Sequence, residues 1–179
     1  MHMIIRKEEA KDYEAVEKVV QRAFEPVEFS DKKEHELVAR IRTSEAFIPE
    51  LSLVAMNLEN EEIIGHILFS KIKIVGEGKT AESLALAPVS VLPAYQNKGI
   101  GRRLIEEGIQ AARELGYGSV IVLGHSEYYP KFGFKKASLW GIKAPFEVPD
   151  DAFMALELIE NSLKDQSGVV EYSKAFFEA

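Results

Sequence analysis

The sequence predicts an α/β fold in which a mixed, mainly antiparallel sheet is flanked by helices. Residues 51–58 and 62–75 are two long apolar segments separated by a short polar turn, which is typical of an antiparallel hairpin. Residues 83–91 and 119–123 are apolar segments separated by a helical pattern, and residues 12–24 also have helical periodicity. A strand–helix–strand unit implies a parallel pair, so both kinds of pairing are expected in one sheet.

Length and composition restrict the class of protein. The chain has 179 residues, of which 46% are hydrophobic and 28% charged, so we expect one domain over residues 1–179. The net charge of -7 opposes binding to nucleic acid. Cysteine is absent, which excludes disulfides and thiolate chemistry. We see neither a membrane span nor a signal peptide, and therefore expect a cytoplasmic protein without membrane contacts.

The amino-terminal third predicts a strand followed by two helices. A short strand is expected at residues 3–6, and the helix over 12–24 begins with Asp12 as a candidate N-cap. A second helix follows Asp31, with Glu34 three residues later as in a capping box. These two helices are expected to form one unit.

The second strand of the hairpin changes its buried face part-way along. Ile63, Ile67 and Phe69 fall on odd positions, whereas Ile72 and Ile74 fall on even ones. Because side chains alternate along a strand, this switch predicts a β-bulge near Ser70.

The second half of the chain contains the predicted centre of the sheet. Residues 83–91 are apolar almost throughout, as in a strand buried on both faces. The helix over 100–115 places Ile100, Leu104, Gly108, Ala111 and Leu115 on one face, and Gly116 ends it. The remaining expected elements are a strand at 119–123, a helical turn at 128–132, a strand about Phe134, and strands at 152–158 and 169–172.

The segment between the central strand and this helix is a candidate anion site. Residues 96–101 contain Gly99 and Gly101, and the start of a helix presents free N–H groups and a positive dipole end that suit a pyrophosphate. Arg102 and Arg103 add positive charge. The pattern fits neither a P-loop nor a dinucleotide fingerprint, because Leu104 stands where the latter needs glycine. The alternative is that the glycines serve only a tight turn.

Two motifs resemble the GNAT superfamily of acyl-CoA N-acyltransferases. Residues 86–101 are similar to its motif A, a strand and a Pro-containing loop followed by Gln/Arg-x-x-Gly-x-Gly/Ala. Residues 128–134 resemble motif B, with an aromatic pair followed by Gly-Phe. The resemblance covers residues 3–138, most closely the bacterial YhbS-like branch at 124–129, and leaves residues 139–179 as a carboxyl-terminal extension. It implies the GNAT sheet, with a splayed parallel strand pair that admits acetyl-CoA.

The resemblance also implies roles for individual residues. Tyr129 corresponds to the tyrosine that protonates the leaving thiolate, and Tyr128 is the alternative. Apart from the resemblance, the protonated amine needs a base, for which Glu82 and His125 are candidates, His125 also as an acceptor contact. The alternatives are that Glu82 is a solvated strand end, that His125 only hydrogen-bonds in a loop, and that ordered water relays the proton, as in many family members. The positions matching the cofactor site are Val89, Ser90, Val91, Gln96, Asn97, Lys98, Gly99, Ile100, Gly101 and Arg102.

The expected activity is therefore direct transfer of an acetyl group from acetyl-CoA to a primary amine, in a ternary complex of a monomer or homodimer. The acidic chain favours a cationic acceptor such as a polyamine, an aminoglycoside-like compound, or a lysine or amino terminus. A non-catalytic acyl-CoA-binding module is the main alternative, and a nucleotide-binding regulator is a third hypothesis. The four histidines are scattered, so no metal site is expected.

Overall fold

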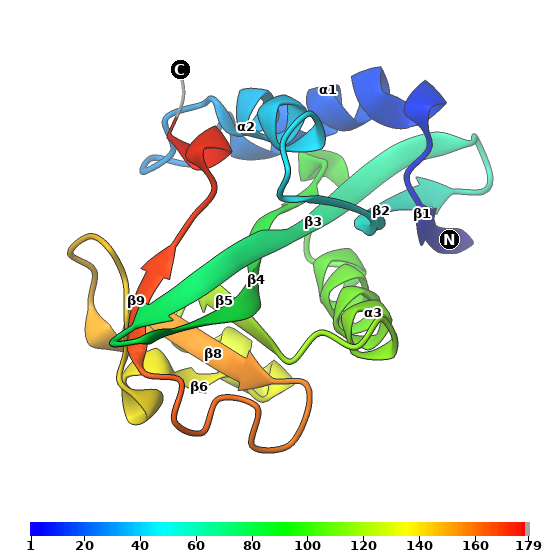
Figure 1. Ribbon diagram of the computed structural model, residues 1–179. Coiled ribbons are helices and arrows are strands. Elements are labelled where there is room, and N and C mark those ends of the chain that lie inside the picture. The colour runs from blue at the N-terminus through cyan, green and yellow to red at the C-terminus, as the bar shows by residue number, and fades with distance from the viewer. Residues whose placement is uncertain (178–179) are drawn as a thin grey trace.

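A single mixed sheet organises the computed structural model, which describes residues 1–177 (Figure 1). The sheet has the order β1-β2-β3-β4-β5-β8-β6, with β9 paired to β3 and β7 to β9. The strands are β1 (Met3–Lys7), β2 (Phe47–Asn57), β3 (Glu62–Gly76), β4 (Lys79–Val91), β5 (Ser119–Leu123), β6 (Lys135–Lys136), β7 (Ile142–Lys143), β8 (Phe153–Glu157) and β9 (Gly168–Glu171). The helices are α1 (Tyr13–Phe24), α2 (Glu34–Arg42) and α3 (Ile100–Glu114).

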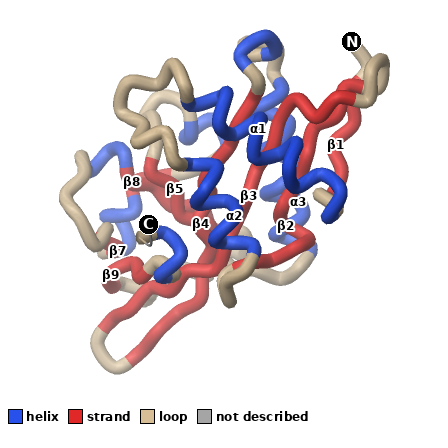
Figure 2. Tube along the Cα trace, turned by 90° about the horizontal axis from the view of Figure 1, so that it is seen from above, coloured by secondary structure: helices blue, strands red, loops and turns tan. Residues whose placement is uncertain are grey.

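The helices cover the two faces of the sheet. Helices α1 and α2 lie side by side over one face, and α3 lies on the other (Figures 1 and 2). Each helix buries an apolar stripe against the strands, as Val16 and Val20 do in α1 and Leu104 and Ile105 do in α3. Leu115, expected on the buried face, instead follows α3 and is 46% exposed, whereas Ile109 and Ala112 of α3 are buried.

The predicted pairings are confirmed. Strands β2 and β3 form an antiparallel hairpin, β4 is central, and β4 and β5 run parallel. The extension adds strands to this same sheet, because β8 pairs with β5 and β9 pairs with β3. The extension therefore contributes strands to the sheet on both sides of the β4–β5 pair.

Strands β4 and β5 pair over only a short length. The register joins Leu84 to Val120 and Ala85 to Ile121, after which β4 continues to Val91 without β5 beside it. On its other edge, β4 stays paired with β3 as far as Val91. The sheet therefore opens between β4 and β5 towards the carboxyl ends of the two strands.

The bulge expected in β3 near Ser70 lies mainly in the neighbouring strands. Between the pairs Ile67↔Val89 and Phe69↔Leu86, β4 has one residue more than β3. Strand β2 also has extra residues opposite Ser70, whereas β3 pairs regularly with β4 from Phe69 to its end. The switch of buried face has a different cause, since residues 63–70 are covered on both sides and later residues on one.

At both predicted helix starts, the hydrogen bonds differ from those of the expected side-chain caps. Asp12 precedes α1, but its carboxylate accepts the backbone N–H of Glu9 at 2.8 Å and pairs with Arg6 at 2.7 Å. The hydrogen bond from Arg6 holds the pKa of Asp12 below its ordinary value. Helix α2 begins at Glu34 without the capping box, because Asp31 accepts the N–H of Lys33 instead.

A buried polar network joins α2 to the sheet and to α1. Arg42 of α2 pairs with Glu8 at 2.6 Å and with Glu17 of α1 at 2.8 Å, and the Glu8 side chain is 1% exposed. The Ser52 hydroxyl donates to Glu8 and lies 2.9 Å from Nε2 of His66. Burial, with a smaller contribution from Arg42, lowers the pKa of His66 to about 3, so this imidazole is neutral near pH 7.

We expect Arg42→Ala to lower the free energy of unfolding by about 3–5 kcal/mol, because it leaves the buried Glu8 carboxylate without its partner. Lys18→Ala is the matched control, since the Lys18–Glu14 pair is exposed and its loss costs less than about 0.5 kcal/mol. Urea denaturation of both variants measures the difference. Equal destabilisation by the two substitutions would contradict the structural role of the buried pair.

Candidate active site

The segment between β4 and α3 forms an exposed cradle of backbone N–H groups. A 3₁₀ turn at Pro93–Tyr95 leads into residues 96–99, which are exposed. Gly99 is the N-cap of α3 with φ of +81°, a conformation that favours glycine, and no side chain caps the helix. The first intrahelical bond runs from Arg103 N–H to the Gly99 carbonyl at 3.1 Å. The N–H groups of residues 100–102 are therefore available to an anion.

The charges around this helix start favour an anion as well. The first turn contains no acidic residue, and the Ile100 side chain points into the core, where it is 2% exposed. The Arg102 side chain is exposed, and its Nε lies 3.5 Å from Oε1 of Glu106, one helical turn later. The positive end of the helix dipole and the Arg102 guanidinium thus lie on the same exposed end of α3.

The free edge of β4 presents the backbone of Val89 and Val91. Leu92 N–H donates to the Ile64 carbonyl of β3 at 2.9 Å, and alternate residues of a strand direct their polar groups to opposite edges. The backbone N–H and C=O of Ser90 therefore point to β3. Those of Val89 and Val91 point to the opposite edge of β4, which β5 no longer covers. The side-chain amide of Gln96 donates to the Val91 carbonyl at 3.1 Å, which ties the cradle to this edge.

Tyr129 begins the short helical turn after β5 and is held by close packing. Its side chain is 8% exposed, and its ring lies against Gly124, where an added Cβ would be 2.4 Å from the ring edge. The Phe134 ring contacts it edge-on at 5.7 Å between centroids. Burial raises the pKa of Tyr129 to about 12, so the phenol keeps its proton at neutral pH.

Tyr128 lies closer to the start of α3. Its hydroxyl oxygen is 4.0 Å from the position that a Cβ on Gly101 would occupy, and its ring meets that of Tyr129 at 5.2 Å. Burial also raises the pKa of Tyr128. His125 is exposed beside this pair, and its carbonyl accepts the N–H groups of Tyr128 and Tyr129 at 3.1 and 3.4 Å. The structure thus places both tyrosines and His125 at the carboxyl end of β5.

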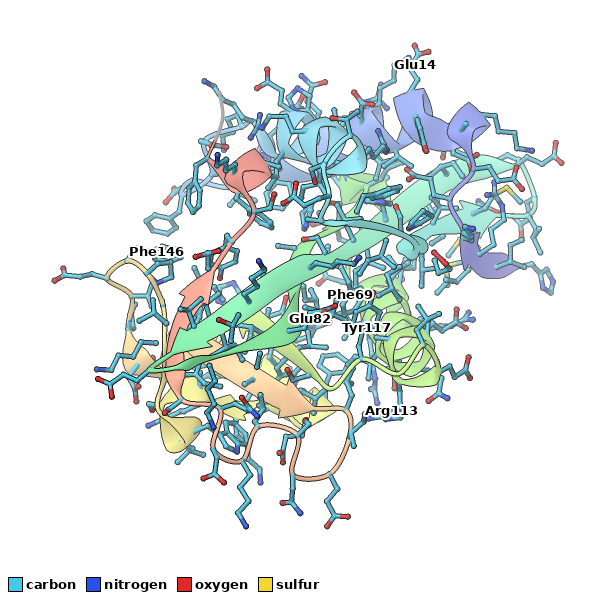
Figure 3. The ribbon with its side chains drawn as sticks, viewed as in Figure 1. Glu14, Phe69, Glu82, Arg113, Tyr117 and Phe146 are labelled. Atoms are coloured by element: carbon cyan, nitrogen blue, oxygen red, sulfur yellow. The ribbon has the colours of Figure 1, made fainter. Side chains whose placement is uncertain are left out.

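Glu82 lies apart from this group of residues. It lies exposed near the amino end of β4, seven positions before Val89, and a strand rises about 3.3 Å per residue. Its charge acts instead on Tyr117, whose pKa is raised first by burial and then by Glu82 (Figure 3). Glu82 and Tyr117 line a separate hollow with Glu50.

An apolar cavity of about 250 Å³ lies where β4 and β5 part, and the sequence did not predict it. Its walls come from both strands, from α2 and from the extension. The lining residues are Leu37, Ala85, Leu86, Ala87, Ile121, Leu123, Phe146, Tyr172, Phe176 and Phe177. The one signal in the sequence was the concentration of aromatic residues at 146 and 172–177.

Glu34 and His35 are half-buried at the start of α2, and the Ser30 hydroxyl donates to one carboxylate oxygen of Glu34. Among residues 1–177, side chains form no cluster of three or more potential metal ligands. Within the same range, none of the helices has the length and apolar character needed to cross a membrane.

Comparisons with known proteins identify the relatives of this chain. The acetyltransferase (GNAT) family model matches residues 13–134. The N-acetyltransferase YhbS of Escherichia coli K12 is 32% identical over 97% of this chain and 98% of its own length. YjhQ of the same strain, also named an N-acetyltransferase, is 40% identical over 69% of this chain and 67% of its own length.

Solved structures give the same result. The crystal structure of E. coli YhbS in complex with CoA superposes with a TM-score of 0.88 and 27% identity, covering 99% of this chain and 93% of that one. A GNAT acetyltransferase from Brucella melitensis in complex with acetyl-CoA gives a TM-score of 0.80 and 36% identity, covering 98% of each chain.

The raised pKa of Tyr129 predicts a loss of stability in alkali. Between the unfolded pKa of about 10 and the folded value of about 12, the unfolded chain releases a proton that the folded chain keeps, so stability falls as pH rises. One such group contributes a slope of about 1.4 kcal/mol per pH unit. Burial likewise raises the pKa of Tyr172 to about 12.

Urea denaturation across this alkaline range measures the slope. We expect Tyr129→Phe and Tyr172→Phe each to reduce it, and the double variant to reduce it by the sum. An unchanged slope in the Tyr129→Phe variant would show that this phenol ionises alike in both states.

Proposed function

Because this chain belongs to the GNAT family of acetyltransferases, we propose that it transfers the acetyl group of acetyl-CoA directly to a primary amine in a ternary complex. The observation that carries the proposal is the gap between β4 and β5, with an anion cradle at one side and a protonated tyrosine at the other. The absence of cysteine favours direct attack over a thioester carried on the protein.

The residues at the gap fit acetyl-CoA. In the proposal, the backbone of residues 96–102 and the Arg102 side chain bind the pyrophosphate, which accepts hydrogen bonds from the free N–H groups at the start of α3. The polar backbone groups of Val89 and Val91 pair with the pantetheine arm at the free edge of β4, as a further strand would. The CoA and acetyl-CoA complexes of the two similar structures support this choice of ligand.

The chemical step needs two protons removed from the acceptor ammonium and one supplied to the CoA sulfur. After the first proton has left, the neutral amine nitrogen forms a bond to the thioester carbon, the C–S bond breaks, the nitrogen loses its second proton, and the CoA sulfur gains one. A backbone N–H at Val89 stabilises the charge that develops on the carbonyl oxygen. We assign the proton donor to Tyr129, since its phenol is neutral at pH 7 and sits at the carboxyl end of β5.

His125 is the proposed contact for the acceptor amine and its proton. It is exposed, follows the end of β5, and is joined through its carbonyl to the turn that bears both tyrosines. A neutral imidazole has one ring nitrogen that can accept a proton or a hydrogen bond from an ammonium ion. The extension belongs to the same catalytic domain in this proposal, because β8 and β9 pair with β5 and β3.

Ligand binding is tested first by thermal unfolding with acetyl-CoA, CoA, ATP and NAD. A ligand that binds only the folded state stabilises it by about 2.7 kcal/mol at one hundred times its Kd. We expect a saturable shift with acetyl-CoA and CoA and none with NAD. Gly101→Glu should abolish the shift through charge repulsion, because a Cβ there meets nothing closer than 3.8 Å and the fold tolerates it.

Gln110→Glu is the control, since it adds the same charge on an exposed position of α3 away from the cradle. If acetyl-CoA stabilises the Gly101→Glu variant as well as wild type, the pyrophosphate does not bind at this helix start.

The acid assignment is tested by Tyr129→Phe and Tyr128→Phe. We expect Tyr129→Phe to lower kcat by about 10²- to 10⁴-fold, the usual contribution of general acid–base catalysis, with little change in acetyl-CoA affinity. Tyr128→Phe should have a much smaller effect. A large loss of kcat in Tyr128→Phe alone would assign the acid to Tyr128, whose hydroxyl lies nearer Gly101.

A further inference from the structure

The cavity between β4 and β5 begins at the last residue pair that joins the two strands. Ala85 and Ile121 form that pair, and both line the cavity, as do Ala87 and Leu123 beyond it. Ala87 is two residues before Val89, in the stretch of β4 that has one residue more than β3. The cavity therefore lies next to the backbone that is proposed to hold the thioester.

The outer wall of the cavity is a packed group of aromatic side chains from the extension. Phe146 stacks on Tyr172 with 6.1 Å between ring centroids and 20° between ring planes. The ring centroid of Phe176 lies 5.0 Å from that of Tyr172. Leu37 of α2 also lines the cavity. Phe146 lies on the loop after β7 (Figure 3), is 42% exposed and lines the cavity.

The helix that lines the cavity and the helix that bears the anion cradle cover opposite faces of the sheet. Leu37 belongs to α2, which covers one face of the sheet, whereas the cradle begins α3 on the other face (Figure 1). In this arrangement the acceptor reaches the thioester from the face opposite the one that binds the pyrophosphate. A ternary complex needs room for both substrates at once.

The lining determines which chemistry fits. Among the described residues, none that lines the cavity carries a charge. A cavity of about 150 Å³ lined by aliphatic and aromatic groups already holds benzene, so 250 Å³ accommodates one ring and a short linker. A hydroxyl or ammonium group buried there without a partner costs about 1–3 kcal/mol, which disfavours polyamines and aminoglycosides.

From this position and lining, we infer that the cavity receives a ring-sized apolar substituent of the acceptor, so that the substrate class is a primary amine joined to an aromatic group by a short linker. The inference rests on the proposed function and replaces the expectation of a highly cationic acceptor. Two sources present this chemistry: a free arylalkylamine, and the amino terminus of a peptide that begins with phenylalanine.

The first experiment compares kcat/KM for three amines: 2-phenylethylamine, the tripeptide Phe-Ala-Ala and spermidine. We expect one of the aromatic amines to exceed spermidine by at least about tenfold, and the better of the two identifies the source. Spermidine as the best substrate would overturn the inference. The proposed function fails separately, if acetyl-CoA neither binds nor is consumed with any amine.

The second experiment uses Phe146→Ala, with Leu139→Ala as the matched control in the same extension. Leu139 is 68% exposed and does not line the cavity. We expect Phe146→Ala to raise KM for the aromatic amine about tenfold with acetyl-CoA affinity unchanged, and Leu139→Ala to change neither. Equal KM values in the two variants would contradict the assignment.

Direct binding gives a readout that does not depend on turnover. Calorimetric titration of the CoA-saturated protein with 2-phenylethylamine and with the tripeptide should give saturable binding of one of them, weakened in Phe146→Ala and retained in Leu139→Ala. Absence of saturable binding of both ligands to the CoA complex would reject the inference even if acetyl-CoA itself binds.

Discussion

The early parting of β4 from β5 is the constraint on which the candidate site depends. β4 remains bonded to β3 along one edge up to Val91, while its other edge is paired with β5 only at Leu84 and Ala85. A buried strand edge requires hydrogen-bond partners, and the polar backbone beyond Ala85 supplies groups suited to an extended ligand. The anion cradle, the tyrosine pair and the apolar cavity all border this opening.

Helix α2, which lies beside this opening, is held in place by ion pairs of its buried Arg42 side chain. Arg42 holds α2 to Glu8 and to Glu17 of α1, and Arg40 Nε donates to the Ala175 carbonyl of the extension at 2.9 Å. Leu37, between the arginines and the start of α2, is thereby held against the cavity. The same helix thus connects the stability of the fold to the shape of the proposed acceptor pocket.

The elements that the sequence predicted well are those determined by local patterns. The hairpin, the crossover unit and the helix before Gly116 follow from hydrophobic period and turn residues, which act over a few positions. The misassigned details depend on contacts between distant segments. Asp12 is the N-cap residue of α1, as predicted, but its carboxylate bonds to Arg6 and to the Glu9 N–H instead of the helix N–H groups, and the extra residue opposite β3 lies in β4.

By itself, the sequence determined the fold class and the glycine-containing start of α3, because a strand, a loop and a helix in succession place that cradle without help from the rest of the chain. It also placed Tyr129 and His125 after β5. Only the tertiary structure placed Glu82 in a hollow with Glu50 and Tyr117, because these residues come from three separate segments of the chain. It alone brought Phe146, Tyr172 and Leu37 together around β4, because pairing of β9 with β3 folds the extension back over the opening.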